Sequence, residues 1–152
     1  MLLALKRPLT GLPEAPPVGQ TETKLNISVV FTSVDATLKA LKEAGALARK
    51  LGAHITLVAP QVVPQPLPLT SPPVLLDWNE RRFSVIAGES KVDTTVHLYL
   101  CRDRVETLMS ALTPHSLVVV GGHRRWWWQT SEEKLAKTLR SAGHEVIFTE
   151  TE

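Results

Sequence analysis

The sequence of 152 residues predicts an α/β protein, a single doubly wound domain whose five-stranded, mostly parallel sheet has helices on both faces. Three observations predict this fold. Short apolar runs alternate along the chain with longer segments whose apolar residues recur at helical spacing. Residues 117–120 are an unbroken apolar run, as in a strand covered on both faces. Residues 27–59 hold a strand, a helix and a second strand within about 35 residues, the size of a parallel crossover.

Composition limits the function classes. The hydrophobic fraction of 43% and the charged fraction of 21% are ordinary for one globular domain. A net charge of +2 with scattered basic residues argues against nucleic-acid binding. Since no apolar run approaches the length of a membrane span or a signal-peptide core, we expect no membrane contact and a cytoplasmic location. The single cysteine, Cys101, excludes an internal disulfide, and we expect it to be buried and inert.

Residues 1–24 differ from the rest of the chain. They combine four prolines and two glycines with a polar QTETK ending. This composition predicts a flexible proline-rich leader, and it places the folded domain in residues 25–152. The leader is interpreted either as a disordered terminus or as a tail that docks on a partner.

The first half of the domain reads as strand, helix, strand. Residues 27–32 form the first predicted strand, Asp35 is the expected N-cap of the helix that follows, and Gly52 is its stop. Residues 54–59 form the second strand. Residues 60–73 contain six prolines, so we expect a surface loop there, because proline cannot donate a ladder hydrogen bond inside a central strand.

The second half continues the alternation. Asp77 is expected to cap a short helix that ends near residue 87, residues 94–100 give a third strand, and Asp103 caps a helix that runs to residue 112. The strand at 117–120 is expected to end at Gly121 and Gly122. A final helix follows, and residues 145–149 close the sheet.

Three segments resemble the universal stress protein family, over about residues 26–150. They are TLKALKEAGALARKLGAHITLVAP, LTPHSLVVVGGH and SEEKLAKTLRSAGHEVIFTE. The resemblance implies a sheet of order 3-2-1-4-5 and a homodimer formed through the last strand, here residues 146–149. It also implies that a nucleotide, where a member binds ATP, lies between strands one and four.

The nucleotide motif of the ATP-binding members matches this sequence poorly. Those members carry an acidic residue at the end of the first strand, where this chain has Thr32. Their loop, G-x-x-G-(nine residues)-G-[ST], matches only at Gly121 and at the final hydroxyl of Thr130. The other two loop glycines fall on Arg124 and Gln129, and the loop is several residues too short. Because glycine lets backbone N–H groups approach a phosphate closely, these losses predict a degenerate member that does not bind ATP in the usual way.

The loop between this strand and the last helix carries Arg124, Arg125 and three consecutive tryptophans. The arginines are interpreted as solvated side chains or as an anion site beside the helix N-terminus, where Thr130 and Glu133 have capping-box spacing. Two interpretations of Trp126, Trp127 and Trp128 stand side by side: the rings fill the vacant nucleotide cleft, or they form an anchor for a protein partner.

No catalytic or metal-binding pattern is present. The five histidines lack ligand spacing, and no paired carboxylates flank the glycine turn, so we expect neither a metal site nor an enzyme. The sequence predicts a non-catalytic regulatory or stress-response module that acts through dimerisation and partner binding, without a cofactor. The alternative is a sensor of adenine nucleotides or other anions. Its candidate binding residues are Thr32, Ser33, Gly121, Gly122, Arg124, Arg125, Thr130 and Ser131.

Overall fold

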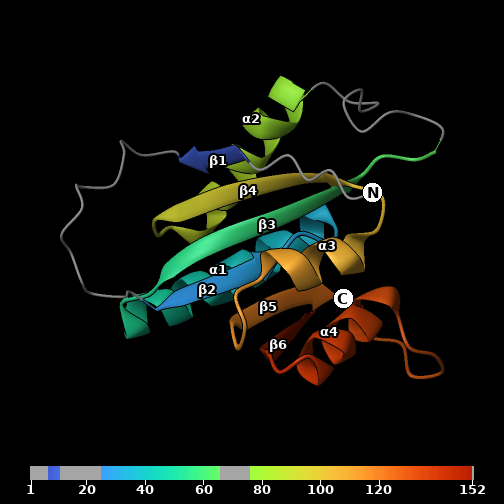
Figure 1. Cartoon of the computed structure of the whole chain (residues 1–152). Coiled ribbons are helices and arrows are strands. Elements are labelled where there is room, and N and C mark those ends of the chain that lie inside the picture. Colours follow the sequence, from blue (N-terminus) through green and yellow to red (C-terminus); the bar gives the residue numbers. More distant parts are fainter. Residues whose placement is uncertain (1–6, 11–24, 66–75, 152) are drawn as a thin grey trace.

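A computed structural model describes residues 7–10, 25–65 and 76–151 of the chain (Figure 1). Five parallel strands form the centre of one sheet: β2 (Asn26–Val30), β3 (His54–Val62), β4 (Thr94–Cys101), β5 (Leu117–Gly122) and β6 (Glu145–Glu150). They lie in the order β4-β3-β2-β5-β6. With these five strands numbered in chain order, this is the predicted order 3-2-1-4-5.

A sixth strand, β1 (Arg7–Thr10), was not predicted. It pairs antiparallel with β4, and Arg7 lies opposite Leu98. The strand falls inside the range predicted as a leader without strands, and Pro8 is one of the residues behind that prediction. A proline is tolerated here because β1 is at the edge of the sheet, so only one side of its backbone needs a hydrogen-bonding partner. The other residues of the predicted leader, 1–6 and 11–24, lie outside the described residues.

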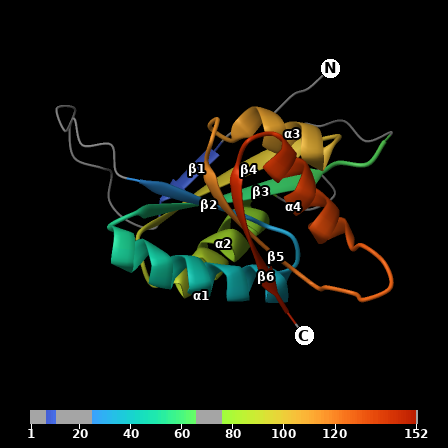
Figure 2. The same cartoon turned by 90° about the horizontal axis from the view of Figure 1, so that it is seen from below.

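Two pairs of helices cover the two faces of the sheet (Figure 2). Helices α1 (Val34–Leu51) and α2 (Leu76–Ala87) lie on one face, and α3 (Arg104–Ala111) and α4 (Ser131–Ser141) lie on the other. A short 3-10 helix, η1 (Gly88–Ser90), follows α2. Within the described residues, none of the helices is both long and apolar enough to cross a membrane.

The strand residues divide between two apolar cores according to the alternation of a β-strand. Ile27 and Val29 of β2 face α1 and α2, where they pack with Leu41 and Phe83, all of them fully buried. Val30 of the same strand faces α3 and α4, in a cluster that includes Leu108, Leu135 and Leu139. The central strands are therefore covered on both faces, as the apolar runs predicted.

The helix boundaries confirm most of the predicted caps and correct two. Gly52 ends α1 in the left-handed region with φ 64°, Asp103 caps α3, and Thr130 forms a capping box with Glu133 at the start of α4. The N-cap of α1 is Ser33 rather than Asp35: its hydroxyl accepts a hydrogen bond from the Ala36 N–H. Asp77 likewise lies one residue inside α2, whose first residue is Leu76.

The prediction of a loop from Pro60 onward was also wrong at its start. β3 runs on to Val62, and Pro60 lies opposite Tyr99 of β4. The other neighbour, β2, pairs with β3 only as far as Val58. Beyond that point β3 pairs with β4 alone among the described strands, so the missing N–H of Pro60 costs no hydrogen bond between them.

Candidate functional site

The candidate residues gather around the carboxyl ends of β2 and β5, the neighbouring strands at which the order of the sheet reverses. Open α/β sheets bind ligands at this kind of edge. Here the two strand ends are joined directly: the Thr32 hydroxyl donates to the Gly121 carbonyl oxygen at 2.8 Å. The Thr32 N–H donates to the hydroxyl of Thr37 in α1 at 3.1 Å. The N–H and the hydroxyl of Thr32 therefore both donate within the protein.

Gly121 and Gly122 are needed for helix packing. A Cβ at Gly121 would lie 2.3 Å from the Ala36 carbonyl oxygen of α1, and one at Gly122 would lie 2.4 Å from the Cβ of Glu132 in α4. Both contacts are far closer than packed carbon and oxygen atoms allow. The glycines were expected to end the strand, but both belong to β5, and they pair with Thr149 and Glu150 of β6.

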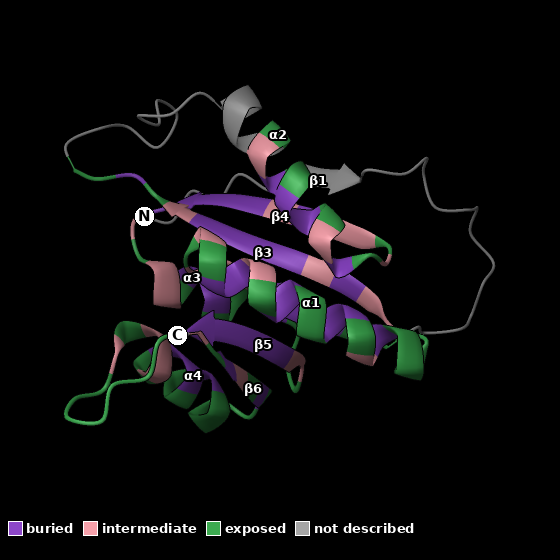
Figure 3. Cartoon of the chain, turned by 180° about the vertical axis from the view of Figure 1, so that it is seen from behind, coloured by how far each residue is buried: buried purple, intermediate pink, exposed green. Residues whose placement is uncertain are grey.

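Residues 123–129, here called the aromatic loop, connect β5 to α4. The Thr130 hydroxyl closes the base of this loop, since it donates to the His123 carbonyl oxygen at 2.8 Å and accepts from the Glu133 N–H at 3.2 Å. His123 is held on the other side by Thr151, whose carbonyl oxygen lies 3.0 Å from the His123 Nδ1. All seven residues of the loop are exposed, whereas the β5 residues just before it are buried (Figure 3).

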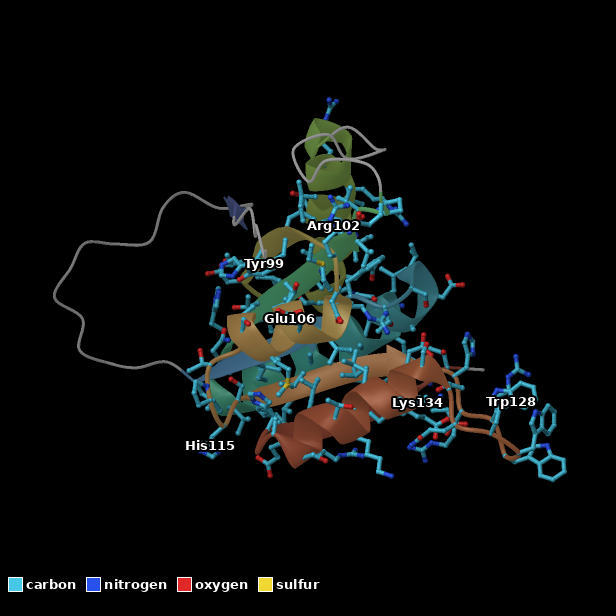
Figure 4. All side chains as sticks on the ribbon, turned by 45° about the vertical axis from the view of Figure 1, so that its right-hand side comes forward. Tyr99, Arg102, Glu106, His115, Trp128 and Lys134 are labelled. Carbon is cyan, nitrogen blue, oxygen red and sulfur yellow. The ribbon has the colours of Figure 1, made fainter. Side chains whose placement is uncertain are left out.

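The three tryptophans lie on the outside of the molecule. Trp126 is 89% exposed, Trp127 52% and Trp128 57%. Neighbouring rings contact each other edge to face, with centroids 5.0 Å apart for Trp126 and Trp127 and 4.9 Å apart for Trp127 and Trp128. The loop carries Trp128 well away from the sheet and helices (Figure 4). The interpretation in which the rings fill the nucleotide cleft is therefore wrong.

The two arginines of the loop have different surroundings. The Arg124 guanidinium lies 5.1 Å from the centre of the Phe148 ring of β6, and its Nε lies 4.0 Å from Glu133 Oε2. Arg125 instead lies over the Trp128 ring, with its guanidinium carbon 5.9 Å from the ring centre. Arg124 therefore packs against the domain, and Arg125 belongs to the tryptophan surface.

Only some of the candidate residues come together. Thr32 and Gly121 are hydrogen bonded, Ser33 caps α1, and Thr130 caps α4. Ser131 is the exposed first residue of α4. The sequence reasoning missed Phe148 as the partner of Arg124. Finding it required the register of β5 and β6, which places Val120 opposite Phe148 and which no local motif specifies.

Two further features bear on chemistry. Burial raises the pKa of the Cys101 thiol, so this fully buried side chain has little thiolate at neutral pH, as expected for an inert cysteine. A pocket of about 390 Å³ lies at the opposite, amino-terminal edge of β2 and β5, where Asn26 and His115 are among its lining residues. In the part of the chain that is described, no three potential metal ligands cluster.

Solved structures of two universal stress proteins have a similar fold. The universal stress protein of Archaeoglobus fulgidus is 18% identical, with a TM-score of 0.53, and the match covers 82% of this chain and 92% of that one. A protein of the same family from Burkholderia pseudomallei is 22% identical, with a TM-score of 0.59, covering 83% and 96%. No family model matches the sequence, and no curated protein matches it significantly.

Both structures match nearly their whole length to this domain. The chain therefore has the fold of the universal stress proteins.

Proposed function

We propose that this protein is a non-catalytic regulatory module of the universal stress protein type, cytoplasmic, which forms a homodimer and binds a protein partner through the aromatic loop. One observation carries the proposal: three adjacent tryptophans are exposed at the position where the ATP-binding members of the family have their phosphate loop. Exposed aromatic side chains are costly to keep in water and are the residues that most often anchor protein interfaces.

The geometry of the loop supports a binding role. The three rings contact one another edge to face, and the base of the loop is fixed by Thr130 and His123. A surface held in place before binding loses less conformational entropy when a partner docks. Arg125 beside Trp128 adds the pairing of arginine with tryptophan that is enriched at interfaces.

β6 is the surface that we propose for the homodimer. It pairs with β5 on one side, and no other described strand pairs with its outer edge, where the Val146 and Glu150 carbonyl oxygens accept from Arg140 and Lys39. Ile147 on this strand is 38% exposed. Changing Ile147 to Glu should shift the protein toward monomer in sedimentation velocity, while the same change at Val85, which is 78% exposed on α2, should not. Equal sedimentation of the two variants would rule out β6 as the dimer surface.

The sensor of adenine nucleotides or anions has less support. Its candidate residues already have roles within the fold. The hydroxyls of Thr32, Ser33 and Thr130 form hydrogen bonds inside the protein. Gly121 lies so close to α1 that a side chain would not fit there. What favours this alternative is the position of Ser131 as the first residue of α4 and of Arg124 beside Glu133 in the first turn, because an anion is stabilised there by the helix dipole. Glu132 and Glu133 in the first turn already supply negative charge there.

Titration of ATP, ADP and cyclic dinucleotides into the purified protein separates the two proposals. Because the aromatic loop follows directly after β5, a nucleotide bound at the end of this strand should change tryptophan fluorescence and raise the melting temperature. We expect no saturable response up to millimolar ligand. A saturable response would make the protein a nucleotide sensor instead.

Changing Trp127 to Ala tests the aromatic loop itself. We expect the variant to lose binding to its partner protein while its melting temperature is unchanged, because the ring is half exposed and its ring contacts are with Trp126 and Trp128. Val85→Ala is the matched control, since it also removes exposed apolar surface but from a distant helix. Retained binding in the Trp127 variant would count against the loop as the partner surface.

A further inference from the structure

The aromatic loop has features that restrict what it would bind. Its three exposed rings contact one another edge to face, with neighbouring planes 77° and 69° apart. Arg125 lies beside this row and forms no ion pair with the described residues, whereas Arg124 is turned toward Phe148 and Glu133. The surface therefore offers three exposed aromatic rings and one basic group.

A polyproline II peptide fits such a surface. This helix rises about 3.1 Å per residue, so three residues span about 9 Å. Neighbouring ring centres are 5.0 and 4.9 Å apart, so a peptide turn of this length extends over more than one ring. Proline-rich segments are bound by aromatic surfaces in several recognition modules, because the peptide is already extended and loses little entropy on docking. Prolines three residues apart then face the same side.

The chain itself contains one segment with this pattern. Pro13-Glu14-Ala15-Pro16-Pro17 has prolines at i and i+3 and a glutamate that would pair with Arg125. The other proline-rich stretch, residues 60–73, has neither prolines three residues apart nor any acidic residue. Charge and spacing both select the first segment, which lies outside the described residues.

The segment cannot reach the aromatic loop of its own copy. Thr10 pairs with Thr95 at the amino-terminal end of β4, whereas the loop leaves the carboxyl end of β5, four strand spacings from β1. With strands about 4.8 Å apart and about 20 Å for the six residues of β5, the two points are about 28 Å from each other. Pro13 is three residues after Thr10 and lies within about 11 Å of it. A second copy must supply the segment.

We propose that the aromatic loop of one molecule binds the segment Leu12–Pro17 of a second molecule, with Pro13 and Pro16 against the tryptophans and Glu14 beside Arg125. This inference rests on the proposed function, because it names the partner of the same surface. It makes association of the protein depend on its own leader and on ionic strength.

A synthetic peptide of residues 9–20 provides the test. The acceptor is the full chain carrying Pro13→Ala and Pro16→Ala, so that its own segment does not compete. We expect a saturable change of tryptophan fluorescence, at least about tenfold weaker with a peptide that carries the same two changes. The Glu14→Gln peptide should bind a few-fold more weakly, by a factor that shrinks at high salt. An acceptor that also carries Trp127→Ala should give no saturable response.

Several results would overturn the inference. These are the absence of a response, equal binding of the peptide without prolines, and unchanged binding by the Trp127→Ala acceptor. Vesicles of phosphatidylserine and phosphatidylcholine serve as a second probe, and a response to them without one to the peptide would make the occupant a lipid surface.

Sedimentation velocity of the full chain completes the test. Pro13→Ala with Pro16→Ala should weaken association as much as Trp127→Ala does, and the combined variant should be no weaker than either. If only the tryptophan variant is affected, this inference fails and the proposed partner surface survives. If neither set of changes alters sedimentation, and the Trp127→Ala variant still binds its partner protein, then this inference and the proposed partner surface both fail.

Discussion

Gly121 and Arg125 are four residues apart, yet they belong to opposite kinds of structure. Gly121 is buried under α1, where even a methyl group would collide with the Ala36 carbonyl. Arg125 lies in a run of seven exposed residues that contains three tryptophans. The fold is thus tightly packed up to the end of β5, whereas Arg125 and the tryptophans that follow have ring contacts with one another.

This contrast separates the residues that hold the fold together from those that would bind a partner. The strand, the helix N-terminus and the two glycines are the frame on which a phosphate loop is built in α/β proteins. In this chain the two glycines let α1 and α4 pack closely on β5. The loop on the frame packs little against the core, so its sequence is free to specify a binding surface.

The largest expected effect on stability comes from a change in the packed region, at Gly121. Gly121→Ala should lower the free energy of unfolding by about 1–3 kcal/mol, because α1 must move away from β5 to admit the methyl group. Urea denaturation measures it. Gly88→Ala is the control, since a Cβ there meets nothing within 4 Å and should change stability by less than about 0.5 kcal/mol. Equal stabilities for the two variants would show that the contact between α1 and β5 relaxes without cost.

Thr130 lies between the aromatic loop and α4, and replacing it should have the next largest effect on stability. Thr130→Ala removes the cap of α4 and the hydrogen bond to the His123 carbonyl, so we expect a loss of about 1 kcal/mol in thermal or urea unfolding. Thr130→Ser keeps the hydroxyl and should recover most of this loss. If serine behaved like alanine, the methyl group rather than the hydrogen bonds would be responsible.

A smaller effect is expected at the junction of β2 and β5. Thr32→Val keeps the shape of the side chain but removes the hydroxyl that donates to Gly121, and this should cost about 0.5–1 kcal/mol. Thr32→Ser retains the donor and is the control. A Thr32→Val variant as stable as wild type would mean that water replaces this half-buried hydrogen bond fully.

Much of the packed region was predictable, because local rules and burial act on the same residues. The apolar runs gave the five parallel strands, and Gly52, Asp103 and Thr130 were recognisable as caps. The errors arose where pairing between distant strands decides the outcome. β1 and the continuation of β3 through Pro60 both depend on pairing with β4. Local sequence does not specify which strands become neighbours in the sheet.

The site was less predictable than the fold. The role of Ser33 as the cap of α1 depends on the backbone angle at the end of β2, and a serine next to an aspartate leaves that choice open. The direction of Trp126–Trp128 had no local signal at all. A run of tryptophans is as compatible with filling a cleft as with exposure, and what decides is whether α1 leaves a cleft beside Gly121.

The smallest effect on stability, and the sharpest test of the comparison, is expected at Trp126. Its ring is 89% exposed, and its ring contact is with Trp127, so Trp126→Ala should change the free energy of unfolding by less than about 0.5 kcal/mol in urea denaturation. Binding by the aromatic loop should nevertheless weaken, because an exposed ring of the binding surface is lost. A variant that is destabilised as strongly as Gly121→Ala would show that the loop packs on the domain in solution. Intact stability with weakened binding would separate the two regions, because one residue would then matter to the partner and not to the fold.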